Sequence, residues 1–257
     1  MVLTSRDFTY DVWRAICDTF ISSGFVPLTV ADYVSMKHSS ILPQKYVILR
    51  HDIDRRPSHA LAMAESEAEN GIHSTYYFRV PYTFDKAMIQ KISELGHEIG
   101  FHYECLSKTN GDSAAAVKLF VEELAMLRDH VEVKTICMHG RPTSPYDNRD
   151  LWKEYSFEDY GVIGEAYLSI SDVCYFTDTG RSWGSTNSVR DSLAGAKEHP
   201  VITRSDEFIA WIPKTDECGV YVTAHPERWA RSIGDWVYCS MKDEVMGMVK
   251  KLLRVIK

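Results

Sequence analysis

The 257-residue sequence lacks the segments that direct a chain to a membrane or an export pathway. Its N-terminus has no basic region followed by an apolar core, which a secretory signal requires. No apolar run is long enough to cross a bilayer. Its six cysteines include no Cys-x-x-Cys pair, and most lie in apolar or mixed runs, as reduced buried cysteines do. These absences predict a cytoplasmic protein without membrane insertion.

The sequence also lacks an excess of positive charge. It has 29 Lys and Arg against 36 Asp and Glu, a net charge of −7, which gives no electrostatic reason to expect nucleic acid or an anionic membrane as a partner. It has no internal repeat, low-complexity tract or linker rich in Pro, Gly or Ser. We therefore predict a single domain over 1–257, with its core motifs in 44–230 and with helices 7–35 and 241–256 packed on it. The oligomeric state is not predicted.

Apolar and aromatic runs alternate with amphipathic runs along the chain, which predicts strands that alternate with helices. The predicted strands are 46–52, 73–80, 97–102, 134–139, 160–166, 169–177 and 219–224. The predicted helices are 7–23, 30–34, 57–70, 85–95, 112–130, 187–197, 205–211 and 241–256. This alternation predicts an α/β fold with a parallel sheet and crossover helices, either open or closed into a barrel.

The first long strand ends in the charged run Arg50-His51-Asp52-Ile53-Asp54. Side chains alternate along a strand, so Asp52 and Asp54 point to one side and His51 to the other. Two converging carboxylates repel each other unless a cation or a shared proton lies between them. One carboxylate could then bind a divalent metal while the other takes a proton from water. In the alternative interpretation, Asp54 caps the next helix and Asp52 pairs with Arg50.

Polar side chains also follow the ends of the other predicted strands. These residues are His102 with Glu104, His139 with Arg141, the segment from Asp178 to Trp183, and the segment from His225 to Trp229. The carboxyl ends of parallel strands share one rim, and this rim holds the active site in such folds. An Asp and two His from separate strands would form a zinc-type ligand set there.

Each of these residues has a structural alternative. His139 could hydrogen-bond a loop carbonyl, and His225 could either fix a turn or act as a general acid, because imidazole titrates near neutral pH. Arg141 could bind a substrate anion, orient a carboxylate or form a structural ion pair. Trp183 and Trp229 could pack on a sugar face, or they could lie in the core.

The order of these motifs resembles that of the polysaccharide deacetylase superfamily, the NodB-like, metal-dependent carbohydrate esterases. The matching segments, after the paired aspartates, are Gly71–Phe78, Gly96–His102, Arg141–Tyr146 and Val222–His225. The resemblance extends over about residues 44–230. The Arg-His-Asp-x-Asp form looks closer to a divergent branch that is often associated with surface-polysaccharide gene clusters.

The resemblance implies a distorted (β/α) barrel that hydrolyses a carbon–nitrogen bond other than a peptide bond. The expected reaction removes an N-acetyl group from an amino sugar of a surface-polysaccharide precursor, linked to a nucleotide, a lipid or a glycan. It implies that Asp54, His102 and His139 bind a divalent metal, most simply zinc. Asp52 would then be the base and His225 the acid.

Further residues complete the predicted site. Arg141 would orient the base or the substrate, and the substrate-binding residues would be Trp183, Asp178, Trp229 and Glu104. The chain departs from the family where a second metal-binding histidine would stand, because that position is Leu106. His139 or Glu104 could replace it, or the ligand could be absent, and the roles of the two aspartates could be exchanged. The alternatives are a carbohydrate-binding protein that has lost catalysis, and a hydrolase of formamides or cyclic amides.

Overall fold

The strands of this computed structural model form one parallel sheet that curls into a distorted, open (β/α) barrel, as predicted. The structure describes residues 6–141, 144–184 and 191–242. The strand order is β6-β5-β4-β3-β2-β8-β7, and β1 pairs with the first half of β2. The strands are β1 Val26–Leu28, β2 Tyr46–Ile53, β3 Thr75–Phe78, β4 Glu98–Tyr103, β5 Val133–Met138, β6 Gly164–Glu165, β7 Cys174–Thr177 and β8 Gly219–Ala224.

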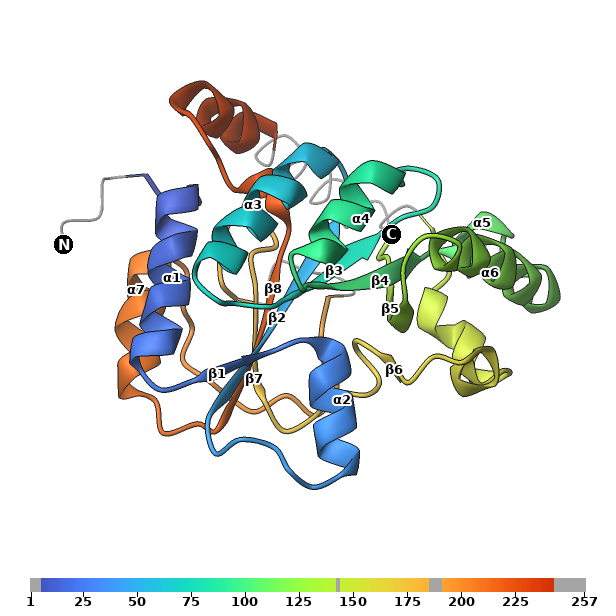
Figure 1. Cartoon of the computed structure of the whole chain (residues 1–257), viewed down its shortest axis with the longest axis horizontal. Coiled ribbons are helices and arrows are strands. Elements are labelled where there is room, and N and C mark those ends of the chain that lie inside the picture. The colour runs from blue at the N-terminus through green and yellow to red at the C-terminus, as the bar shows by residue number, and fades with distance from the viewer. Residues whose placement is uncertain (1–5, 142–143, 185–190, 243–257) are drawn as a thin grey trace.

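Helices surround this sheet (Figure 1), with α1 and α7 on one side of the view, α3 and α4 above, α5 and α6 opposite, and α2 below. The α-helices are α1 Tyr10–Ser22, α2 Val30–His38, α3 Pro57–Glu69, α4 Lys86–Glu94, α5 Cys105–Lys108, α6 Ser113–Arg128 and α7 Ser205–Trp211. The 3₁₀ helices are η1 Asn148–Lys153, η2 Phe157–Tyr160, η4 Ile212–Lys214 and η5 Pro226–Arg228. Among the described residues, no helix is both long and apolar enough to span a bilayer.

Strand β2 is central to the sheet and is buried along its whole length. Val47 and Leu49 pack outward into a cluster that includes residues of α1 and α7, whereas Ile48 packs into the larger cluster formed with β3 and β4. Both faces are therefore covered, which is why this strand is a continuous apolar run before its charged end. The same alternation directs Arg50 and Asp52 to the inner face of the barrel.

The second half of the chain is less regular than predicted. The strand expected over 160–166 shortens to β6, and the one over 169–177 begins only at Cys174, because Asp172 has a left-handed backbone (φ 61°) that interrupts an extended run. In the helix expected over 187–197, residues 191–197 form turns and a β-bridge instead, and 187–190 lie outside the described residues. Most of the helix predicted over 241–256 also lies outside them.

A buried carboxylate, Glu67 of α3, joins the outer side of β2 to the helices. It accepts hydrogen bonds from Trp13 Nε1 (2.9 Å) and Tyr76 Oη (2.7 Å), and it faces His51 Nε2 at 2.9 Å. His51 therefore points away from the two aspartates, as strand alternation predicted. Burial alone would raise the pKa of Glu67, but the facing His51 outweighs burial and lowers this pKa to about 2.

Replacement of Glu67 by Gln should therefore destabilise the fold in a pH-dependent way. The folded-state pKa lies below the value of 4.5 for an ordinary Glu, so the stabilisation is complete above that pH and is lost as the pH falls through about 2. We expect Glu67→Gln to lower the free energy of unfolding at pH 7 by about 3 kcal/mol, with the difference from wild type narrowing in acid. Urea unfolding measured from pH 7 to pH 3 checks this. Exposed Glu69→Gln on the same helix is the matched control, and equal effects of the two variants would contradict the prediction.

Candidate metal and acid–base site

Three side chains from three strand ends converge at the carboxyl rim of the barrel. Asp54 follows β2, His102 lies in β4, and His139 follows β5. Asp54 Oδ1 lies 3.0 Å from His139 Nδ1 and 3.4 Å from His102 Nε2, and the two nitrogens are 3.3 Å apart. Ligand atoms bound to one tetrahedral zinc at about 2.0–2.1 Å are separated by roughly 3.3–3.4 Å. These three residues therefore have the spacing to hold one metal ion, and they are the three that the sequence predicted.

The surroundings of these atoms also suit a metal. His102 Nδ1 lies 3.0 Å from the carbonyl oxygen of Cys137, and donation there leaves the Nε2 lone pair facing Asp54. Asp54 Oδ1 is buried without a hydrogen bond of good geometry. Burial would raise the pKa of Asp54, but His139 and His102 lower it well below its usual range. The donor set is thus an ionised carboxylate with two imidazoles.

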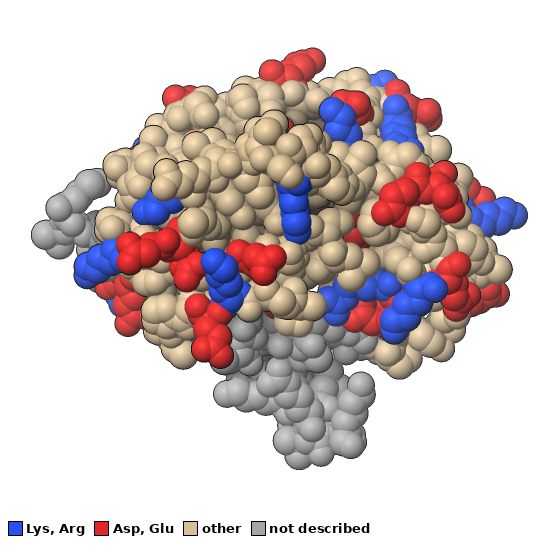
Figure 2. Space-filling view, turned by 90° about the horizontal axis from the view of Figure 1, so that it is seen from below, with Lys and Arg blue, Asp and Glu red and all other residues tan. Residues whose placement is uncertain are grey.

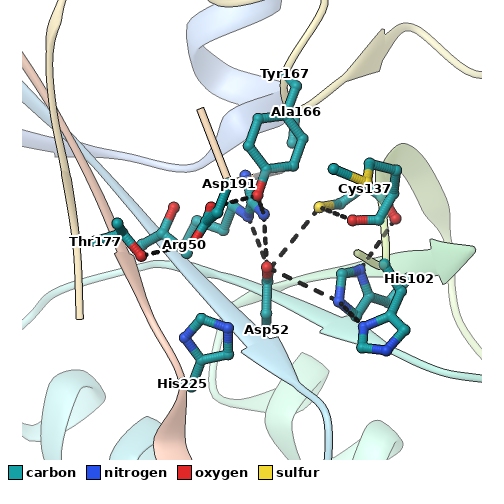
Figure 3. Close-up of polar contacts among 12 residues, drawn as sticks. Arg50, Asp52, His102, Cys137, Ala166, Tyr167, Thr177, Asp191 and His225 are labelled. Atoms are coloured by element: carbon teal, nitrogen blue, oxygen red, sulfur yellow. Dashed lines mark hydrogen bonds and ion pairs between the residues drawn. The ribbon is translucent and has the colours of Figure 1, made fainter. Parts of the chain in front are cut away.

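Asp52 is held by an arginine on the inner side of the same strand (Figure 3). Arg50 Nε and Nη2 donate to the two oxygens of Asp52 at 2.8 and 2.5 Å. Burial opposes ionisation of Asp52, but Arg50 outweighs it and lowers the pKa of Asp52. Asp52 Oδ2 lies 3.8 Å from His102 Nε2, so this carboxylate borders the metal cluster. The ion pair anticipated as a structural alternative is therefore present, and it orients Asp52 toward the site.

The other alternative for these aspartates does not occur, because the N-cap of α3 is Arg56 and not Asp54. Asp52, His102 and Cys137 form a second group whose ligand atoms lie close together. Burial raises the pKa of the Cys137 thiol well above its usual value. A thiol that stays protonated is a poor metal ligand, so the Asp54 cluster fits a metal better.

His225 follows β8 and is held by a buried carboxylate. Its Nδ1 donates to Asp178 Oδ1 at 2.6 Å, and its backbone N–H donates to Asp178 Oδ2 at 2.8 Å. Burial and Arg228 lower the pKa of His225, but Asp178 and Asp54 raise it by more, to about 9. His225 therefore carries a proton at neutral pH, as a general acid must.

The sequence did not reveal the residues that support Arg50. Its guanidinium donates to Tyr221 Oη (3.0 Å) and Tyr167 Oη (2.7 Å), and Tyr167 in turn donates to Asp191 at 2.6 Å (Figure 3). Burial would raise the pKa of Asp191, but His225 and Arg50 lower it. No local pattern marked these residues, since between 24 and 171 positions separate the partners along the chain.

Three of the predicted substrate-binding residues are buried and cannot contact a substrate. Trp183 and Trp229 are both 0% exposed in the core, where their indole N–H groups donate to Ser205 Oγ and to Asp178 Oδ2. Neither can stack on a sugar, so the predicted sugar contacts are corrected. Asp178 is also 0% exposed, because it lies behind His225 and binds its imidazole instead of a substrate.

Glu104 differs from its predicted role, whereas the predicted contact of Arg141 with a substrate stays a prediction. Glu104 is buried and pairs with Arg79 at 2.6 Å, so it is a counter-ion and not a third member of the metal cluster. Arg79 also donates to the backbone oxygen of Asp54 at 3.1 Å, which links this pair to the rim. Arg141 is exposed after β5. The arginine that contacts Asp52 is Arg50.

Comparisons with known proteins found solved structures that are similar at low sequence identity. A CE4 esterase from Streptococcus mutans is 14% identical, with 88% of this chain and 88% of that chain covered and a TM-score of 0.47. A family 4 carbohydrate esterase from Bacillus anthracis is 15% identical, covering 92% and 84%, with a TM-score of 0.41. The deacetylase PplD from Streptococcus pyogenes, in complex with acetate, is 11% identical, covering 81% and 88%, with a TM-score of 0.49. No family model and no curated protein matches the chain.

The zinc content of variants should show whether the three clustered residues or Glu104 bind the metal. We expect about one zinc ion per chain after zinc is offered to the purified protein. Asp54→Ala and His139→Ala should each lose most of it, because each removes one of three protein ligands. Glu104→Gln should keep it, since Glu104 pairs with Arg79 instead. Elemental analysis after gel filtration measures the content. If His139→Ala kept its zinc and Glu104→Gln lost it, Glu104 and not His139 would be the third ligand.

The pH dependence of any turnover should report the Asp178–His225 pair. The pKa of His225 is raised to about 9, so the acid form is present below that pH and is lost above it. Asp178→Asn removes the carboxylate that raises this pKa. We expect the alkaline limb of kcat/KM to move at least about one unit toward lower pH. Rate profiles of both proteins from pH 6 to pH 10 measure this, and an unmoved limb would exclude His225 as the acid.

Proposed function

We propose that the protein is a metal-dependent hydrolase that removes the N-acetyl group from an amino sugar of a surface-polysaccharide precursor. The observation that carries this proposal is the cluster of Asp54, His102 and His139, with its ligand atoms 3.0–3.4 Å apart. An ionised carboxylate, Asp52, and a protonated imidazole, His225, border the same rim. A base and an acid with separated pKa values are what hydrolysis of an amide needs.

Each residue has one role in the proposed reaction. Asp54, His102 and His139 would hold the metal, which when bound polarises an acyl oxygen and lowers the pKa of water. Asp52 would accept the proton of the attacking water, and Arg50 orients its carboxylate with a two-point contact. His225 would donate its Nε2 proton to the leaving nitrogen, because its Nδ1 is occupied by Asp178.

The substrate and the compartment follow from the sequence and stay predictions. The motif order resembles that of enzymes acting on N-acetylated carbohydrates, which supports an amino sugar over other amides. A cytoplasmic precursor, instead of a finished wall polymer, is the expectation taken from the sequence. Zinc is proposed because the donor set contains two imidazoles and one carboxylate, which suit that ion.

Asp52→Asn should abolish most turnover without loss of the metal. Asparagine keeps the size of the side chain but cannot take a proton, and general-base catalysis contributes roughly 10²–10⁴-fold. We therefore expect a decrease of that order in acetate release from N-acetylglucosamine oligosaccharides, with an unchanged zinc content.

Exposed Asp18→Asn on α1 is the matched control for this measurement. Metal-dependent turnover that survives Asp52→Asn would refute the role of Asp52 as base. Formate should be assayed beside acetate, because release of formate alone from a formylated sugar would assign the site to a deformylase. A protein that holds no metal but binds glycans would instead be a binding protein on this fold.

A further inference from the structure

The three residues of the metal cluster are not connected to one another in the same way. His102 lies in β4, and the backbone N–H of His139 donates to the oxygen of Tyr103 in the same strand at 2.7 Å. Asp54 follows β2, which is separated from β4 by β3 (Figure 1). The pairing of β2 with β3 ends at Ile53, and its pairing with β8 ends earlier. The position of Asp54 therefore depends on contacts outside these ladders.

A side chain that follows the middle strand supplies such a contact. Arg79 comes directly after β3, and its Nη1 donates to the backbone oxygen of Asp54 at 3.1 Å. Its Nη2 donates to Glu104 Oε1 at 2.6 Å, and Glu104 lies two residues after His102. A planar fork of N–H donors can bind two acceptors at once. One guanidinium therefore joins the end of β2 to the end of β4 across β3.

The turn after β3 holds the same end of β2 at a second point. Thr83 is 2% exposed, and its Oγ1 donates to the backbone oxygen of Ile53 at 3.1 Å. The same oxygen accepts a hydrogen bond from the backbone N–H of Arg79 at 2.9 Å. Backbone oxygens need other donors where a ladder ends. This turn supplies donors to two consecutive residues, Ile53 and Asp54, and so fixes the backbone that carries the metal-binding carboxylate.

The pair of Arg79 and Glu104 is buried, unlike most charged groups of the protein. Figure 2 shows acidic and basic side chains side by side on one face of the molecule, where water screens their interactions. Glu104 is instead 1% exposed, and the side chain of Arg79 is 15% exposed. Lys108 Nζ lies 4.0 Å from Glu104 and donates to the backbone oxygen of Val80 at 2.6 Å. Arg79 is therefore held in one orientation between Asp54 and Glu104.

This arrangement accompanies the departure of the chain from the family at Leu106. Leu106 is 5% exposed and packs in the core. The segment after His102 thus provides no second imidazole, but it provides a carboxylate that holds Arg79. The three ligands come from three different strands, so no helix or strand sets the spacing of two of them by itself. The contacts between the strand ends have to set it.

We propose that Arg79, held by Glu104, is a positioning residue that fixes the place of Asp54 in the metal cluster and thereby raises the affinity for the metal. The proposal rests on the proposed function, in which Asp54, His102 and His139 hold a divalent metal. Arg79 binds the backbone of Asp54 and not its carboxylate, so it acts through the position of this residue. Partners that hold a metal ligand in place typically change metal affinity by about 10–100-fold. Without Arg79, the spacing of 3.4 Å between Asp54 Oδ1 and His102 Nε2 would no longer be fixed.

The zinc affinity of the full-length protein, measured by competition with a chromophoric chelator, tests this proposal. Arg79→Lys keeps the charge and the pairing with Glu104, but it lacks the fork that also reaches Asp54. We expect it to bind zinc at least about tenfold more weakly than wild type. The visible absorption bands of bound cobalt depend on the arrangement of its ligands, so they should also differ from those of wild type. Glu104→Gln should keep its zinc content with an intermediate affinity, because its amide oxygen still accepts from Arg79.

Arg128→Lys is the matched control for this measurement. Arg128 also donates to backbone oxygens, those of Val133 and Tyr160, but Val133 begins β5 and so lies at the opposite end of the barrel from the metal cluster. Its variant should bind zinc like wild type and leave the cobalt bands unchanged. Wild-type zinc affinity in Arg79→Lys would overturn the proposal. An equal loss in Arg128→Lys would overturn it too, because the loss would then come from a general destabilisation.

Thr83→Val gives a second variant in case Arg79→Lys does not fold. It keeps the shape of the side chain and removes the donor to Ile53, so zinc should bind several-fold more weakly. Wild-type affinity of this variant would then overturn the proposal.

Activity is a separate readout, so the two proposals fail in different ways. Zinc binding with the expected pattern of variants, but without acetate release from any sugar, would refute the hydrolase and leave the role of Arg79 in place. Acetate release by wild type together with unchanged zinc affinity in Arg79→Lys would keep the hydrolase and refute the positioning role. A wild-type protein that binds neither zinc nor cobalt would refute both.

Discussion

The buried ion pair between Arg50 and Asp52 is the interaction on which the centre of this molecule depends. Arg50 is 0% exposed inside the barrel, and burial by itself would lower its pKa, but Asp52 and the surrounding tyrosines raise it well above its usual value. Removal of one member of such a pair leaves an isolated buried charge and costs about 3 to 5 kcal/mol. The barrel is therefore built around a charge whose partner is the proposed base.

Neighbouring groups also set the pKa values at the rim. Asp178 raises the pKa of His225, and the neighbouring His139 and His102 lower the pKa of Asp54. The rim thereby combines a protonated imidazole, the proposed acid, with an ionised carboxylate, the proposed base, although both are buried. Such separated pKa values arise from specific partners and not from burial, since burial opposes the charged form of each group.

Local patterns in the sequence were sufficient for the central strands and helices and for the set of polar residues that meet at the rim. The run before Asp52 predicted β2. The rule that the carboxyl ends of parallel strands share one rim predicted that Asp54, His102 and His139 lie close together. The rule could not identify what lies beneath the rim. Trp229 follows a strand end as His139 does, yet its side chain turns inward and donates a hydrogen bond to Asp178. No local sequence pattern distinguishes these two residues.

The sequence by itself determined the parallel α/β architecture and which residues stand at strand ends, because both follow from the periodicity of apolar and polar positions. Only the tertiary structure decided the partners of those residues. Arg50 holds the proposed base, and Asp178 holds the imidazole of His225. Each of these pairings requires that both side chains are buried and point toward each other. Burial and direction depend on the packing of the whole barrel. Sequence spacing does not predict such a pair when its members are 47 residues apart, as Asp178 and His225 are.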